Sequence, residues 1–155
     1  MAEKDTKKAK SVYGTLCEML DEKHVRYEKH EEDLVITFVM KGDDLPMQFI
    51  LKIDDGRQLI RLSSPIPAKF EGDKRIEGAI ATSQVNYLLA DGSFDFDYEK
   101  GLVYFRMTSS YLDSLISKEL FEYMVAVAGY TIDEYNDKFL MLSKGLLPLE
   151  EFFKN

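Results

Sequence analysis

Residues 92–107 read GSFDFDYEKGLVYFRM and contain the clearest structural pattern in the chain. Three aromatic residues alternate with three acidic residues, and a second apolar run follows Lys100 and Gly101. Successive side chains of a β-strand point to opposite faces of the sheet. The stretch therefore predicts a β-hairpin with one apolar face and one solvated face.

Two registers of this hairpin are compatible with the sequence. A three-residue loop would place Phe94 opposite Arg106 and Asp95 opposite Phe105. A two-residue loop, Lys100-Gly101, would instead form these cross-strand pairs: Glu99 with Leu102, Tyr98 with Val103, Phe96 with Phe105, Asp95 with Arg106, and Phe94 with Met107. We predict the two-residue loop, because it satisfies both the apolar face and the charge pair.

Before the hairpin, the pattern predicts a helix over 6–23, then strands over 25–30, 34–40, 47–53 and 58–63. Pro65 and Pro67 are expected to end the fourth strand, because proline cannot donate to a strand ladder. A second helix is predicted over 73–90. Apolar spacing predicts that its buried stripe consists of Ile76, Ala79, Ile80, Ser83 and Tyr87.

After the hairpin, the sequence predicts helices. Gly129 is expected to end one helix, and the capping box Thr131-Ile132-Asp133-Glu134 to open another, which ends at Gly145. A short segment then begins at Pro148. The order α-β-β-β(-β)-α-β-β-α-α predicts an α+β fold, in which an antiparallel sheet of five to six strands carries its helices mainly on one face.

Length and composition indicate one globular domain over residues 1–155, since 155 residues with 45% hydrophobic residues suffice for one core. Residues 1–10 are expected to form a flexible polar tail. The net charge of −8 argues against nucleic acid as a partner. No stretch has the length of a membrane span, and the single cysteine, Cys17, favours a cytoplasmic protein.

Each candidate for a catalytic or metal-binding residue has a simpler structural interpretation. Cys17 lies on the first helix, two turns from His24, and we expect it to be a small core residue. His24 and His30 lack the further ligands that a zinc site needs. Acidic residues at 95, 97 and 99 fit the wet face of a strand better than a calcium loop, and those at 43–44 and 54–55 fit turns. We expect no catalytic residue, metal or cofactor.

The most informative feature is a surplus of apolar residues opposite the predicted core: Val35, Val39, Ile50, Leu102 and Tyr104. They are expected to form a partner or dimer surface if they are contiguous and exposed. Two alternatives remain open, because surface apolar residues are often scattered, and because the C-terminal helices could cover this face.

The sequence from Asn86 to Arg106 resembles the YbjN family, which belongs to the type III secretion chaperone-like fold. The resemblance is carried by three features: Asn86 near a helix end, Gly92-Ser93-Phe94, and Gly101 followed by Leu102-Val103-Tyr104-Phe105-Arg106. Tyr135, Phe139 and residues 147–151 are also similar. The resemblance covers about 12–152 and implies an α-β-β-β-α-β-β-α domain, often dimeric. It brings no catalytic residue.

Three hypotheses about function follow. The first is a non-enzymatic module that binds a protein or peptide and forms a homodimer, as relatives in this fold bind secreted effectors or other proteins. The second is a small enzyme or ligand-binding domain whose carboxylates converge in a pocket. The third is a structural domain with no dedicated ligand. We favour the first, because the catalytic motifs are lacking and the apolar surplus is present.

Overall fold

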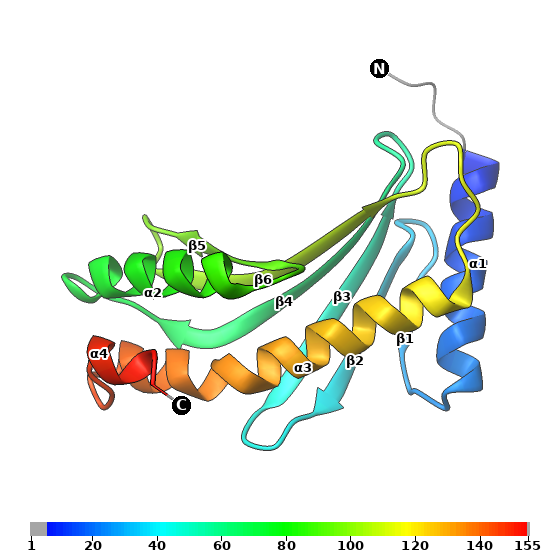
Figure 1. Cartoon of the computed structure of the whole chain (residues 1–155). Helices are drawn as coiled ribbons and strands as arrows, with labels where there is room; N and C mark the ends of the chain where they lie inside the picture. The colour runs from blue at the N-terminus through cyan, green and yellow to red at the C-terminus, as the bar shows by residue number, and fades with distance from the viewer. Residues whose placement is uncertain (1–5, 155) are drawn as a thin grey trace.

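The computed structural model describes residues 6–154, which form a six-stranded antiparallel sheet and four helices (Figure 1). The sheet order is β1-β2-β3-β4-β6-β5. The fold class and the order of elements are as predicted. The elements are α1 (Thr6–Glu22), β1 (Glu28–His30), β2 (Val35–Lys41), β3 (Pro46–Asp54), β4 (Leu59–Lys69), α2 (Lys74–Leu88), β5 (Ser93–Asp97), β6 (Leu102–Ser110), α3 (Lys118–Ser143) and α4 (Leu149–Phe152).

The helices cover one face of the sheet, which we call the inner face. Alternate residues of each long strand are buried there, for example Ile36, Phe49, Leu62 and Phe105. In Figure 1, α3 crosses in front of the sheet from α1 to α4. On the opposite, outer face, none of the described outward-facing residues of β2 to β6 is buried. The core therefore lies between one sheet face and a helical layer.

Phe94 joins four elements inside this core. Its ring centroid lies 5.2 Å from that of Phe105 on β6, and 5.8 Å and 5.0 Å from those of Tyr135 and Phe139 on α3. Phe139 in turn lies 5.0 Å from Phe152 on α4. The alternating pattern of the hairpin places Phe94 on the inner face, so the edge strand β5 is tied to the two C-terminal helices by aromatic packing.

Asn86 closes the outer edge of β5. Its side-chain Oδ1 accepts a hydrogen bond from the Phe94 N–H at 2.7 Å, and its Nδ2 donates to the Phe94 C=O at 2.9 Å. These main-chain groups face away from β6, because neighbouring residues of a strand direct their groups to opposite edges. The amide thus takes the place of a further strand at this edge of the sheet.

The predicted register of the β5–β6 hairpin is wrong by two residues. Phe94 lies opposite Phe105 and Asp97 opposite Leu102, so residues 98–101 form a four-residue connection. A shift of two keeps every side chain on its predicted face. The predicted pair of Asp95 and Arg106 still forms, diagonally, with 2.7 Å between Arg106 Nε and Asp95 Oδ2. The charge pair was therefore no evidence for a two-residue loop.

Two predicted boundaries are also wrong. β4 continues through Pro65 and Pro67 to Lys69, and the pairing with β6 shifts register between Pro65 and Lys69, where the prolines are accommodated. Gly129 and the predicted capping box do not interrupt α3, which runs unbroken over 26 residues. Its buried residues keep helical spacing through this point, and tertiary packing therefore overrides the local signal.

The predicted flexible tail over residues 1–10 is wrong from Thr6 onward; residues 1–5 lie outside the described part of the chain. Thr6 begins α1, Ala9 is fully buried, and Lys8 Nζ donates a hydrogen bond to the Tyr111 C=O at 2.8 Å. Lys7 and Lys10 are exposed on the solvated side of an amphipathic helix, whereas Lys8 is half-buried, and composition alone does not distinguish such a helix from a tail.

Gly101 provides a test of the connection between β5 and β6. It has a positive φ of 70°, donates its N–H to the Asp97 C=O at 2.7 Å and accepts from the Phe70 N–H at 2.8 Å. A Cβ at this position would overlap the Phe70 carbonyl. We expect Gly101→Ala to lower the free energy of unfolding by more than about 2 kcal/mol, measured by urea denaturation.

Gly14→Ala is the matched control, because nothing lies within 4 Å of the added Cβ and the residue is inside α1. This change is expected to stabilise the protein by about 0.5–1 kcal/mol. A cost below about 1 kcal/mol for Gly101→Ala would contradict the interpretation of the loop.

Candidate functional site

Three of the five predicted surface residues lie together on the outer face, near the β1 side of the sheet. Val35 and Val39 are on β2, and Ile50 of β3 lies opposite Thr37, so it is a diagonal neighbour of both valines. Val39 is 65% exposed, whereas Val35 and Ile50 are half-buried. These residues form a small apolar group, which we call the β2–β3 group.

The other two residues, Leu102 and Tyr104, lie apart on β6. Tyr104 is opposite Pro65 on β4 and Asp95 on β5, and it is 39% exposed. Between them and Ile50 runs a polar row, because Ile50 pairs with Ser63 and Ser63 with Arg106. The outer face thus carries two apolar groups separated by polar side chains.

The long C-terminal helix does not cover the outer face, which was one of the open alternatives. α3 packs through its buried residues onto the inner face, and the outward-facing side chains of the described strands are half-buried or exposed. The outer face is therefore open to a partner as far as the described residues 6–154 show.

The prediction of which residues of α2 are buried is wrong, because most of the predicted stripe faces solvent. Ile76, Ile80 and Tyr87 are 54%, 46% and 82% exposed, and Ser83 on the same side is exposed. The buried residues are instead Gly78, Ala81, Thr82 and Val85. They follow the same helical spacing, so periodicity alone could not decide between the two faces. We call the exposed set of Ile76, Ile80, Ser83 and Tyr87 the α2 stripe.

Small side chains explain why α2 packs through the other face. A Cβ on Gly78 would lie 2.8 Å from the Phe96 ring and 2.9 Å from the Phe70 ring, so only glycine allows this close approach. Thr82 satisfies its hydroxyl by donating to the Gly78 C=O at 3.0 Å. The signal in the sequence was a stripe of small residues at helical spacing, Gly78, Ala81 and Thr82, which hydrophobicity scales rank below isoleucine.

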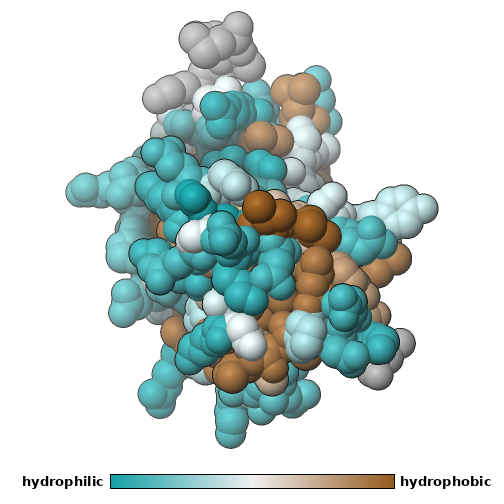
Figure 2. All heavy atoms as spheres, turned by 90° about the vertical axis from the view of Figure 1, so that its left-hand side faces the viewer, coloured by the Kyte–Doolittle hydropathy of each residue, from teal (hydrophilic) through white to brown (hydrophobic). Residues whose placement is uncertain are grey.

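Figure 2 shows hydrophobic side chains gathered in a strip on the side of the molecule where α2 and α4 lie. The exposed large apolar residues of these elements and of the preceding turn include Ile76, Ile80, Leu146 and Phe153. Gly145 lies within reach of the Lys74 side chain, which brings the turn beside the start of α2. Hydrophilic residues flank the strip, as at many protein contact surfaces (Figure 2).

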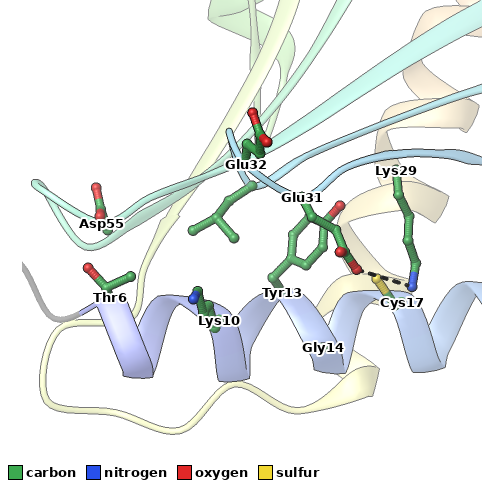
Figure 3. A pocket seen from close by; sticks show the side chains of 10 residues that line it. Thr6, Lys10, Tyr13, Gly14, Cys17, Lys29, Glu31, Glu32 and Asp55 are labelled. Carbon is green, nitrogen blue, oxygen red and sulfur yellow. Dashed lines mark ion pairs between the residues drawn. The ribbon is translucent and has the colours of Figure 1, made fainter.

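A hollow of about 890 Å³ runs along α1 (Figure 3). Lys29 Nζ lies 3.8 Å from Glu31 Oε1 at one end, near Cys17. Tyr13 donates its hydroxyl to the Val35 C=O at 3.0 Å. Glu32 and Asp55 also line the hollow, but their carboxylates point away from α1 (Figure 3). The carboxylates thus do not converge on a common point.

The chemistry available at this hollow is limited. Burial raises the pKa of the Cys17 thiol, so it is held in the protonated form, which is a poor nucleophile. Burial also raises the pKa of Tyr27, whose hydroxyl donates to Asp21 at 2.8 Å. Among residues 6–154, no group of three or more His, Cys, Asp or Glu side chains is arranged to hold a metal ion.

Four aspartates gather where the β2–β3 turn meets α3. Asp133 Oδ1 accepts a hydrogen bond from the Asp43 N–H at 2.8 Å, so this residue of the predicted capping box in fact anchors the turn. The pKa of Asp44 is raised, mainly by charge repulsion from Asp137. Desolvation and repulsion from Asp133 and Asp43 make smaller contributions in the same direction. The group is a structural contact between turn and helix, with unfavourable charge repulsion at neutral pH.

None of the described helices is long and apolar enough to cross a membrane.

Comparison with protein families gives one match. The model of the YbjN family, described as "Putative bacterial sensory transduction regulator", matches residues 13–141. No curated protein sequence matches the chain significantly.

Solved structures of similar fold include three that match most of this chain. The ExsC–ExsE complex contains a chain that matches with a TM-score of 0.58 and 18% identity, over 85% of this chain and 95% of that one. A chain of the HopA1–SchA chaperone–effector complex matches with a TM-score of 0.51 and 15% identity, over 84% of this chain and 94% of that one. YbjN from E. coli matches with a TM-score of 0.53 and 13% identity, over 84% of this chain and 87% of that one. At these identities the likeness concerns the fold alone.

The pKa of Asp44 yields a test of the aspartate contact. Because that pKa is raised in the folded state, folded protein binds more protons than unfolded protein, and stability falls as pH rises through this range. We expect Asp44→Asn to be more stable than wild type near neutral pH, and this gain to disappear on acidification to about pH 3. Urea denaturation at both pH values measures it.

Asp137→Asn should act in the same direction, since the repulsion between the two carboxylates is mutual. The double variant should gain less than the sum of the single variants, because either change alone removes their repulsion. Strict additivity, or a gain that is the same at both pH values, would argue against the contact.

Proposed function

The chain belongs to the YbjN family, and from that premise we propose that it is a non-enzymatic module that binds a protein or peptide partner. The observation that carries the proposal is the one-sided cover of the sheet. All described helices that pack on the sheet lie on the inner face, and the outer face presents Val39 and Tyr104 to solvent.

The outer face is the proposed partner surface, and its composition supports that role. The β2–β3 group and the pair of Leu102 and Tyr104 are apolar contacts within a polar surround that includes the ion pair of Arg106 and Asp95. Interfaces between separately folded proteins typically combine apolar anchors with a polar rim. The printed descriptions of two similar folds name complexes, of ExsC with ExsE and of SchA with HopA1, and binding in those proteins supports the proposal.

The alternative of a small acidic enzyme has less support. It requires carboxylates that converge in a pocket, whereas Glu31 in the α1 hollow faces Lys29, and Glu32 and Asp55 point away from α1 (Figure 3). The charge of −8 argues against nucleic acid as the partner. The single cysteine, which cannot form a disulfide within the chain, supports a cytoplasmic location.

A homodimer is part of the proposal, and the α2 stripe is its proposed interface. Ile76, Ile80 and Tyr87 recur at helical spacing on a helix whose other side is fully used by Phe70 and Phe96. A helix face can pair with the same face of a second copy across a twofold axis, which gives a closed assembly.

Light scattering coupled to size-exclusion chromatography tests the dimer. The wild-type chain is expected to elute with twice the mass of one chain, and Ile80→Glu to elute as a monomer, because a buried unpaired carboxylate is costly at an interface. Leu115→Glu is the control, since Leu115 is 97% exposed outside the α2 stripe. A wild-type monomer, or a dimer that survives Ile80→Glu, would refute this interface.

Affinity capture from the source bacterium tests the partner surface. Proteins enriched on the wild-type chain and on Leu115→Lys are expected to be lost on the double variant Leu102→Lys, Tyr104→Lys, because two charges would replace apolar contacts. Circular dichroism checks that the variants are folded. If the same proteins are captured by the double variant in equal amounts, this part of the outer face is not the partner surface.

A further inference from the structure

The second half of β2 is an open sheet edge. β2 pairs with β3 over its whole length, from Val35 to Lys41, whereas β1 pairs only with Val35, Ile36 and Thr37. Beyond Thr37 the strand therefore has a neighbour on one side alone. Unpaired strand edges bind further strands readily, and proteins usually cover them.

The direction of the main-chain groups follows from one hydrogen bond. The Ile53 N–H donates to the Leu34 C=O at 3.0 Å, and the β2–β3 register continues from there without a shift. Residues at even positions of β2 thus direct their N–H and C=O toward β3, and Val39 and Lys41 direct theirs to the open edge. Within residues 6–154, no hydrogen bond is found for these four groups.

The chain that precedes β1 does not pair with this edge. His24 has a positive φ of 56°, and the Val25 N–H donates to the Leu20 C=O at 3.0 Å, so the chain leaves α1 through a turn, and its ladder with β2 begins only at Glu28. The opposite edge of the sheet differs, because the Asn86 side chain occupies both main-chain groups of Phe94. The β2 edge thus has unused main-chain donors and acceptors at Val39 and Lys41, whereas those of Phe94 at the β5 edge are occupied.

Two hollows flank the open edge, one on each face of the sheet. The inner hollow, of about 310 Å³, is lined by Met19, Val25, Met40 and Val125, with the ion pair of Lys23 and Glu122 at 3.4 Å beside it. The outer hollow, of about 400 Å³, is more polar and is lined by Arg26, Tyr27, Val39 and Gln48. Side chains of an added strand would alternate between these two spaces.

We propose that the open edge of β2 binds an extended peptide segment of the partner by strand addition, with an apolar side chain of the peptide in the inner hollow. The main-chain groups of Val39 and Lys41 provide affinity, and the alternate hollows provide selectivity. This inference rests on the proposed function and specifies how its partner is recognised.

The recess favours a single extended segment over a second folded copy. It lies between β2 and the chain at 23–27, with α3 on the inner side. The β2 edge of another copy would bring its own residues 23–27 and its own α3 into the same space. A single peptide strand carries no such flanking elements, so it can pair with β2 without bringing further chain into this space.

The test uses short random peptides displayed on phage, selected on the full chain, and then synthesised with a fluorescent label. Binding is measured by anisotropy to Val39→Pro and to the control Val39→Thr. Proline removes only the N–H that faces the open edge, so the β2–β3 ladder is kept. We expect Kd to rise at least about tenfold for Val39→Pro relative to Val39→Thr.

A second measurement is independent of the folding of Val39→Pro. N-methylation of the selected peptide should weaken binding to the wild-type chain at every second residue and leave the intervening residues unaffected, because only alternate residues face β2. This period of two is specific to strand addition.

The outcomes separate this inference from the proposed function. Peptides that bind Val39→Pro and Val39→Thr equally, without a period of two, would overturn strand addition and leave the binding function standing. Absence of any binding peptide overturns the inference, whereas a wild-type chain that captures no protein in the lysate experiment refutes the function itself. If the protein is a dimer and Val39→Pro, but not Val39→Thr, makes it monomeric, the open edge binds a second copy of the chain. That result would overturn the proposal of peptide binding.

Discussion

The packing of Phe94 is the contact on which the arrangement of the sheet and the C-terminal helices depends. β5 is an edge strand of five residues, and a strand of this length at an edge has little stability of its own. The ring of Phe94 fixes it against Phe105 and Phe139, and Phe139 fixes Phe152 of α4. Removal of such a buried ring typically costs about 3–5 kcal/mol, a large part of the stability of a domain.

Much of this arrangement could be predicted from the sequence, because alternation of apolar and polar residues determines which face of a strand is buried. The faces of β5 and β6 were right even though the register was wrong by two, since a shift of two preserves the face. The register itself depends on the turn, where the positive φ of Gly101 and its contact with Phe70 decide the loop length. Phe70 is distant in sequence, so local pattern could not supply this information.

The surface of α2 could not be predicted for a related reason. Two stripes with the same period compete on this helix, and hydrophobicity favours the one that contains Ile76 and Ile80. The sheet surface beneath α2 already carries the large rings of Phe70 and Phe96, so volume decides in favour of Gly78. Of the outer-face residues, all were placed on the correct face, but their division into two groups follows from the strand order, which places β4 between β3 and β6.

The amide of Asn86 has a consequence for how many chains can join this sheet. A sheet with two free edges can accept a strand at each, and repeated addition then produces open-ended polymers. Here the Asn86 side chain occupies both main-chain groups of Phe94 at the β5 edge, whereas Val39 and Lys41 at the β2 edge have no such cover. A strand that approached β5 at Phe94 would first have to displace this amide, whereas a strand that approached β2 at Val39 would meet free main-chain groups. The two edges of the sheet are therefore unequal, and the difference favours addition at one of them.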